Sequence, residues 1–229
     1  IFHHNTGSVI QGNGNVSNGG TMNLNIDLVF PVSIPFTNSG TIQGAGHLTV
    51  NNNFILQGFV QGAGMLTVNG DMTWNSGILD RNFTNQAGRT LTLATSNSKT
   101  LRAPLINDGI LLINGDGNFV HDQGGGSSLT NNGTFTINTN SLIQDNGGVG
   151  PFVNNGTITK AGTGTVNINN FNFTNNGLIE FNGGNTSFSA GSFTNTGTLT
   201  FNSGNAFFTT VFHYNTGSLI QGNGNFSNA

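Results

Sequence analysis

The sequence predicts an all-β protein: one parallel β-solenoid segment over residues 1–229, with about ten coils of about 20 residues each. First, a short motif, Asn-x-Gly-x-apolar, recurs along the chain and often follows Phe-x. Second, apolar and polar residues alternate after each motif, which is the period of a β-strand. Third, Gly and Asn interrupt every window in which a helix could form. Units this short cannot bury their own apolar face, so they must stack.

The spacing of the motif sets the expected coils. In the second half of the chain, the steps between its asparagines shorten from about 24 to about 20 residues. These asparagines stand at positions 107, 131, 154, 175, 195 and 215. In the first half, TIQGAGHLTVN (41–51) recurs as FVQGAGMLTVN (59–69), a step of roughly 18 residues. The interval from Asn75 to Asn85 is too short for a coil, and it indicates either a truncated coil or two turns within one coil.

Each unit is expected to hold two or three short strands separated by Gly and Asn corners. In TFTIN (134–138), Phe135 and Ile137 point to one side of the strand and the polar residues to the other. The segments TITKA, LIEFN and TLTFN follow the same pattern. The apolar side of each strand is therefore expected to face a shared core.

The motif asparagine has an expected structural role. At one corner of successive coils, its side-chain amide can bond to the amides above and below, as in cross-β stacks. The Gly two residues later would permit a sharp turn, and the Phe two residues earlier would stack inside. The expected asparagine ladder comprises Asn38, Asn107, Asn131, Asn154, Asn175, Asn195 and Asn215, and the expected core stack comprises Phe36, Phe152, Phe173 and Phe193.

Three places interrupt the pattern. Residues 26–36 are apolar and hold two prolines, which predicts an edge flap or a lateral packing strip. Residues 94–104 hold two of the five cations and are interpreted as a polar excursion. HDQGGGSS (121–128) and QDNGGVGP (144–151) occupy equivalent places in adjacent units and predict loops stacked on one side.

The two ends of the chain carry nearly the same sequence, NTGSVIQGNGN (5–15) and NTGSLIQGNGN (215–225). Residues 1–19 and 211–229 are therefore interpreted as equivalent ends of a 210-residue super-repeat. We expect it to continue into further copies, either in one polypeptide or by head-to-tail contact between chains. The start at Ile1 without a visible signal peptide predicts a mature or excised segment.

Composition narrows the function classes. Only 6% of residues are charged, with five Lys or Arg and a net charge of −3, which excludes a basic nucleic-acid footprint. No apolar run approaches the length of a membrane span. The absence of cysteine excludes disulfides, zinc–thiolate sites and iron–sulfur clusters. Low charge also favours lateral self-association, because little repulsion opposes it.

Repeats such as FTNSGTI (36–42) and FTNNGLI (173–179), alternating with GxGxLTVN segments, resemble the β-strand repeats of large secreted bacterial surface proteins. Filamentous-haemagglutinin-like adhesins and autotransporter passengers are the better-known members of that group. The resemblance implies a right-handed parallel β-helix, an extracellular location at the bacterial surface, and a structural or adhesive role.

Candidates for chemistry are sparse. Asp108, Asp116, His121 and Asp122 lie within fifteen residues of one another, and Asp145 follows on the next loop. Such carboxylates could serve a carbohydrate-active β-helix enzyme, but Asp is also favoured in turns. We expect no enzyme activity, no cofactor and no metal centre. Asp116 and Asp122 are the candidates for a weakly bound cation.

Histidines and threonines offer two further hypotheses. The histidines at positions 3, 4, 47, 121 and 213 are interpreted as structural rather than metal-binding, and His3 and His213 are equivalent copies. Thr-x-Thr pairs at 134/136, 157/159 and 198/200 form an outward grid that would suit ice binding. Leu178/Glu180, Ile110/Leu112 and Ile78/Asp80 interrupt it, so ordinary strand preference explains it as well.

Together these observations predict a non-enzymatic repeat unit of an extracellular bacterial fibre, stalk or adhesin. Its expected partners are further copies of itself, in head-to-tail or lateral contact. The alternatives are an adhesin whose loops bind a surface glycan, a carbohydrate-active enzyme and, last, an ice-binding protein. A groove with two carboxylates would favour the enzyme, whereas featureless sides and complementary ends would favour the fibre.

Overall fold

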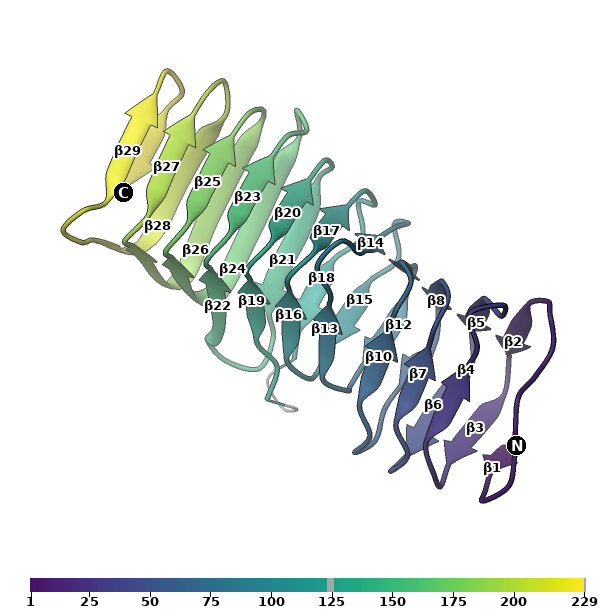
Figure 1. The fold of residues 1–229 in the computed structure, drawn as a ribbon. Helices are drawn as coiled ribbons and strands as arrows, with labels where there is room; N and C mark the ends of the chain where they lie inside the picture. The colour runs from purple at the N-terminus through teal and green to yellow at the C-terminus, as the bar shows by residue number, and fades with distance from the viewer. Residues whose placement is uncertain (123–125, 229) are drawn as a thin grey trace.

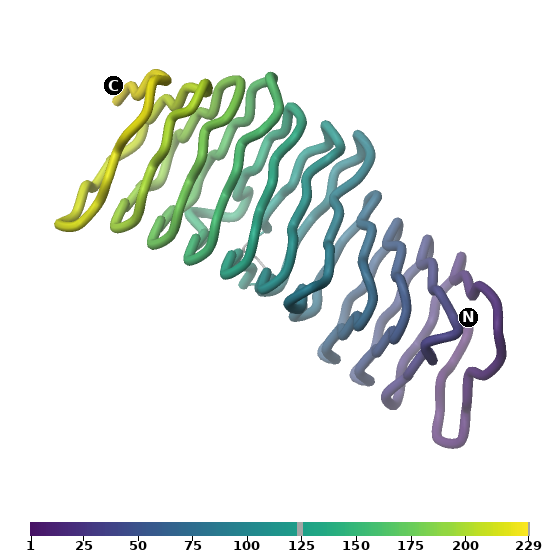
Figure 2. Tube along the Cα trace, turned by 45° about the horizontal axis from the view of Figure 1, so that its top comes forward, coloured from purple at the N-terminus to yellow at the C-terminus, as the bar shows by residue number. Residues whose placement is uncertain are grey.

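The computed structural model describes residues 1–122 and 126–228, and in this part of the chain all regular structure is β-strand. The strands stack into an elongated rod with the N-terminus at one end and the C-terminus at the other (Figure 1). Figure 2 shows the same coils as successive loops along the rod. The strands fall into three columns, and all neighbouring strands pair in parallel. The predicted parallel β-solenoid is therefore confirmed.

The first column begins at the N-terminus and ends with the last strand of the chain. It contains β1 (Phe2–His4), β3 (Thr21–Leu24), β6 (Thr41–Gly44), β9 (Phe59–Val60), β12 (Gly77–Leu79), β15 (Lys99–Leu101), β18 (Phe119–His121), β21 (Ser141–Asp145), the first halves of β24 (Thr165–Asn175), β26 (Asn185–Asn195) and β28 (Asn205–Tyr214), and β30 (Phe226–Asn228).

The second column joins the first into one sheet, because β24, β26 and β28 are long enough to run through both. It contains β4 (Leu28–Phe30), β7 (Leu48–Val50), β10 (Leu66–Val68), β13 (Phe83–Asn85), β16 (Leu105–Asn107), β19 (Leu129–Asn131), β22 (Gly150–Asn154) and the second halves of those three strands.

The third column is a separate sheet of eleven strands. Each coil contributes one strand to it, so the described rod has eleven coils, close to the predicted number of about ten. It contains β2 (Val16–Asn18), β5 (Phe36–Asn38), β8 (Phe54–Leu56), β11 (Met72–Trp74), β14 (Thr90–Leu93), β17 (Ile110–Ile113), β20 (Thr134–Ile137), β23 (Thr157–Lys160), β25 (Leu178–Phe181), β27 (Thr198–Phe201) and β29 (Leu219–Gly222).

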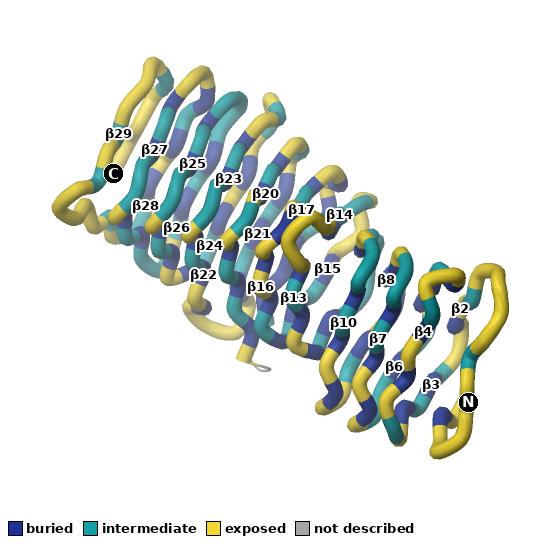
Figure 3. Tube along the Cα trace, viewed as in Figure 1, coloured by how far each residue is buried: buried dark blue, intermediate teal, exposed yellow. Residues whose placement is uncertain are grey.

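The core runs along the axis between the three columns. Within each strand buried and outward residues alternate, as in β20, where Phe135 and Ile137 are buried and Thr136 is half-buried. Figure 3 shows buried segments repeating from coil to coil, whereas the two end coils are largely exposed. The core is therefore continuous along the rod but open at both ends.

The motif changes corner along the chain. Asn18 and Asn38 end strands of the third column, whereas Asn85 and the motif asparagines from Asn107 to Asn195 end strands of the second column. Asn75 follows β11 and Asn85 ends β13 in the same coil. The short step between them is thus two turns within one coil, which decides between the two interpretations of this region.

The two segments predicted to leave the pattern are ordinary parts of coils. Residues 26–36 supply β4 and the start of β5, with Phe30 and Ile34 buried, so no flap forms. Residues 94–104 contain β15, whose Lys99 is buried rather than exposed in a polar excursion. In both segments the buried residues still alternate with outward residues within the strand, although the residues on either side of the strand do not follow this alternation.

Gly77 and Gly217 have the positive φ that the predicted turn requires of the motif glycine, whereas in other coils the glycine is required for a different reason. Gly133, Gly156 and Gly177 do not adopt the left-handed conformation that turns demand of glycine. Each lies directly against the backbone of the previous coil, and a Cβ on Gly156 would lie 2.7 Å from the carbonyl carbon of Asn132. The missing side chain therefore permits close stacking of coils rather than a sharp turn.

Candidate functional site

Six buried asparagines form one continuous ladder at the end of the second column. The side-chain Nδ2 of each of the first five donates to the Oδ1 of the asparagine in the next coil over 2.7 Å, and Asn195, the last, donates to Gly197 O. Each Nδ2 that donates upward also donates to a main-chain carbonyl of the coil it reaches, such as Thr157 O for Asn131. The six are Asn85, Asn107, Asn131, Asn154, Asn175 and Asn195. Because their amides are satisfied, burying them is not costly.

The predicted ladder is therefore correct at five positions and wrong at two. Asn38 belongs to a separate pair in the third column, in which Asn18 Nδ2 donates to Asn38 Oδ1 over 2.7 Å. Asn215 is exposed after the end of β28, and Tyr214 takes the position opposite Asn195. Asn85 belongs to the ladder but was absent from the prediction. It lacks the Asn-x-Gly spacing, although it ends the triplet Phe-Thr-Asn, which also occurs in other copies of the motif.

The predicted phenylalanine stack divides in the same way. Phe152, Phe173 and Phe193 stack in the second column with ring centroids 4.4 and 4.9 Å apart. Phe36 lies in the third column instead, where it stacks on Phe54 at 5.5 Å. The cause is the change of corner, because the aromatic residue moves together with the asparagine that follows it.

Three of the five cations are buried at corners, a feature that the sequence reasoning missed. Arg81 donates to the carbonyls of Gly44, Gly46 and Gln61 over 2.9–3.0 Å and so joins three coils. Lys99 Nζ donates to Thr95 O and Asn97 O, and Lys160 Nζ donates to Gly162 O. Burial lowers the pKa of Lys99 to about 8 and also lowers those of Arg81 and Lys160. These cations satisfy main-chain acceptors.

The candidate carboxylates do not gather into a site. Asp116 is exposed, Asp122 forms an ion pair with Arg102 at 2.9 Å, and Asp108 accepts from Asn132 on the surface. Asp145 is fully buried. In the described part of the chain no group of three His, Cys, Asp or Glu side chains is arranged to hold a metal ion.

A buried polar cluster lies where β18 and β21 meet the side loops. Ser127 Oγ is 3.2 Å from His121 Nδ1, and Asp145 Oδ2 is 4.0 Å from the same nitrogen. Asp145 accepts from the Gly147 N–H over 2.8 Å, and the His121 ring contacts Phe171 edge-on. Residues 123–125 of the loop at 121–128 lie outside the described residues. In a Ser-His-Asp triad the serine and the aspartate contact different nitrogens of the imidazole ring. Here both lie nearest to Nδ1, so the cluster does not have the geometry of a catalytic triad.

Burial makes His121 a source of acid sensitivity, because desolvation lowers its pKa from 6.5 to about 4. The unfolded chain takes up a proton near pH 6.5, whereas the folded chain does so only near pH 4. We therefore expect stability to fall as the pH falls from 6.5 to 4, by up to about 3 kcal/mol. Urea titrations across this range should show a weaker pH dependence for His121→Leu, and equal slopes for both proteins would contradict the prediction.

The other histidines are dispersed. The His3 Nδ1 lies 3.3 Å from Asn23 Nδ2, and His4, which is buried, has its Nε2 3.2 Å from Asp27 O. His47 Nδ1 accepts from the Met65 N–H, and His213 is exposed at the opposite end of the rod. None of them belongs to a group of three or more His, Cys, Asp or Glu side chains that could hold a metal ion in the described structure.

The Thr-x-Thr pairs lie on the outer face of the third column in register. Thr134 and Thr136 pair with Thr157 and Thr159, and the next strand brings Leu178 and Glu180. The predicted interruption at Ile78/Asp80 was placed wrongly, because Ile78 belongs to β12 of the first column. Thr90 and Thr92 of β14 extend the face instead, next to Ile110 and Leu112.

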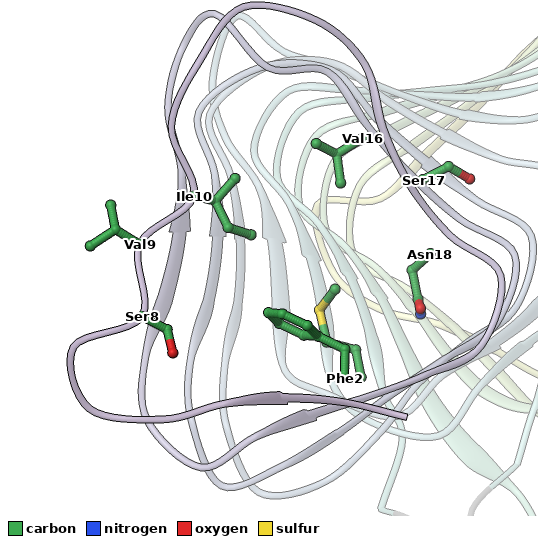
Figure 4. Close-up of a pocket in the computed structure, with 8 residues that line it drawn as sticks. Phe2, Ser8, Val9, Ile10, Val16, Ser17 and Asn18 are labelled. Atoms are coloured by element: carbon green, nitrogen blue, oxygen red, sulfur yellow. The ribbon is translucent and has the colours of Figure 1, made fainter.

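The N-terminal end presents an open apolar cavity of about 480 Å³ inside the first coil. Phe2, Ile10 and Val16 project into it, whereas Val9 points outward (Figure 4). Met22 of the second coil forms its roof. Nothing in the described chain lies beneath this cavity, so the core reaches solvent at this end.

The C-terminal end is also open. The Phe226 side chain is 37% exposed although its ring packs on Phe208 and Phe212 at 5.2 and 5.3 Å. Phe212 and Ile220 are only half-buried beside it. Each end therefore exposes apolar side chains together with main-chain groups of a strand edge that has no neighbour.

No helix of the described structure is both long and apolar enough to cross a membrane. Comparisons with models of protein families, with curated proteins and with solved structures gave no match to this chain. What is established is thus a β-solenoid with a buried asparagine ladder and two open apolar ends.

Proposed function

We propose that this chain is a structural repeat unit of an extracellular bacterial fibre, stalk or adhesin, and that it stacks head-to-tail with further copies of itself. The observation that carries the proposal is the pair of open ends. Both expose a phenylalanine, Phe2 at one end and Phe226 at the other, and both are built from the same sequence motif. A coil built from the same sequence can occupy either end, so the repeated motif favours contact between copies of this unit.

The sides of the rod support a mechanical role. Buried asparagine amides, stacked rings and main-chain hydrogen bonds all repeat along the axis, which favours stiffness over binding specificity. The net charge of −3 over 229 residues opposes close packing of neighbouring rods only weakly. The compositional resemblance to secreted bacterial β-strand repeats supports the extracellular location and the choice of adhesin-like proteins.

End-to-end association is tested by matched substitutions of two exposed phenylalanines. Phe226 lies at the C-terminal end and is 37% exposed, and Phe59 lies on the side of the rod and is 42% exposed. We expect the wild-type protein and Phe59→Lys to form rods longer than one unit with rising concentration, as seen by sedimentation velocity and electron microscopy. Phe226→Lys should stay monomeric, because a charge at the joint cannot be desolvated.

A wild-type protein that remains monomeric at every concentration would contradict head-to-tail stacking of separate chains. Equal loss of assembly in both variants would point to lateral contact instead. The mass of the native polypeptide under denaturing conditions distinguishes covalent from non-covalent continuation, because one segment weighs 23.8 kDa.

A further inference from the structure

The two copies of the end sequence occupy opposite and complementary positions. Residues 2–18 and 212–228 are identical at fourteen of seventeen positions. The first copy pairs with β3 and β5 on one side only, and the second pairs with β26 on the opposite side only, among the residues that the structure describes. One coil with this sequence can therefore satisfy both sets of contacts at the same time.

The contacts above the first copy rely mainly on residues that the second copy retains. Phe2 pairs with Met22, and Asn18 donates to Asn38 over 2.7 Å. The second copy supplies Phe212 and Asn228 at these positions. The retained residues include both the ring that enters the core and the amide that caps the strand.

The substitutions between the copies are also compatible with this position. Val16, which borders the 480 Å³ cavity, is replaced by Phe226, so a larger ring is available where space exists. His4 places Nε2 3.2 Å from Asp27 O, and Tyr214 in its place would keep a polar group that can donate.

The copies differ in which column they occupy. Phe2–His4 lies in the first column and Val16–Asn18 in the third. In the second copy, residues 212–214 lie in the second column and residues 226–228 in the first. From the first copy to the second, the chain therefore completes ten coils and then advances by one more column of strands. The change of corner at Asn75 and Asn85 accounts for this extra face.

We infer that consecutive units join by coil replacement: residues 211–228 of one unit take the place of residues 1–18 beneath β3 and β5 of the next. This rests on the proposed head-to-tail fibre and names the contact that forms it. Between separate chains the incoming coil displaces residues 1–18 of the next unit, which makes the contact heterologous and head-to-tail. Each joint rotates the next unit by one face, so a given side of the unit faces the same direction in every third unit.

Single cysteines test the joint, because the natural chain has none. Ser17 and Thr37 are register partners on the outer face of the third column, where adjacent strands allow a disulfide. Coil replacement puts Ser227 in the position of Ser17. A mixture of Ser227→Cys and Thr37→Cys, incubated warm so that end coils fray and then oxidised, should give a dimer on a denaturing gel.

Two controls accompany this mixture. Thr73→Cys is a chemically matched outer residue of the third column, two coils further from the N-terminus than Thr37. Paired with Ser227→Cys, it reports random collisions and should give several-fold less dimer. His3→Cys paired with Ser227→Cys reports end-on stacking in which the first coil stays in place and β1 lies on β30.

The outcomes separate the two proposals. A dimer from positions 227 and 37 supports coil replacement. A dimer from positions 227 and 3, without one from 227 and 37, would overturn coil replacement and leave the fibre intact. Coil replacement would also be overturned if the pair at positions 227 and 37 gave no more dimer than the Thr73→Cys control, in a protein that sedimentation shows to assemble end to end. Absence of any assembly would overturn both coil replacement and head-to-tail stacking between separate chains.

Discussion

Replacing Phe173 with Asp is expected to unfold the coil that holds it and to disturb the coils on either side. The ring is 2% exposed and lies between Phe152 and Phe193, whose centroids are 4.4 and 4.9 Å away. Loss of a buried ring costs about 3–5 kcal/mol, and an unpaired buried carboxylate adds to it. The thermal midpoint should fall by about 10–20 °C in a chain of this size.

Thr174→Asp is the matched control, because Thr174 is the next residue of β24 and points outward. It should shift the midpoint only slightly. Hydrogen exchange should show that protection is lost in β22, β24 and β26 of the Phe173→Asp variant, since each coil contacts only its neighbours. Stability like that of the wild type in this variant would be incompatible with stacked coils.

Replacing Gly156 with Ala is expected to cost about 3 kcal/mol, although the change adds one methyl group at a half-buried position. The added Cβ would lie 2.7 Å from the carbonyl carbon of Asn132, and that atom belongs to the rigid backbone of the coil before. Relief requires the two coils to separate, which strains the bonds from Gly156 N to Asn131 O and from Thr157 N to Gly133 O. Thermal and urea denaturation would measure the loss.

Gly20→Ala provides the comparison, because Gly20 holds the same position of the motif in the first pair of coils. A Cβ there would meet no atom within 4 Å, and its φ is not positive. The expected change is within about 0.5 kcal/mol. Equal losses at Gly20 and Gly156 would mean that glycine serves the turn itself, as the sequence suggested, and not the stacking of coils.

The repeat predicted the solenoid because alternation of apolar residues and fixed spacing report strand direction and coil length. Five rungs of the ladder, from Asn107 to Asn195, followed from the same regularity. The sequence could not assign Asn38 and Phe36 to another column, because a coil with three corners can place the same motif at any of them. That choice depends on the accumulated lengths of all preceding coils.

The burial of three cations could not be predicted from the sequence, for a different reason. Arg81 contacts the carbonyls of Gly46 and Gly44, which precede it by nearly two coils of chain, so no local pattern links them. Lys99 and Lys160 occupy strand positions that their neighbours fill with apolar residues such as Phe119 and Phe181. These cations are tolerated because main-chain carbonyls at the corners accept their hydrogen bonds, and only the structure shows where those carbonyls lie.

The direction of the inter-coil hydrogen bonds has a mechanical consequence. Strands lie across the rod and pair along it, so tension applied to the two termini acts on those bonds one coil at a time. The chain released by one yielding coil is the stretch between register partners, as from Leu66 to Phe83 or from Ile143 to Ile168. Extended, such a stretch spans about 60–80 Å, against about 4.8 Å when folded. Under load the rod would therefore lengthen stepwise and dissipate work while its covalent chain stays intact.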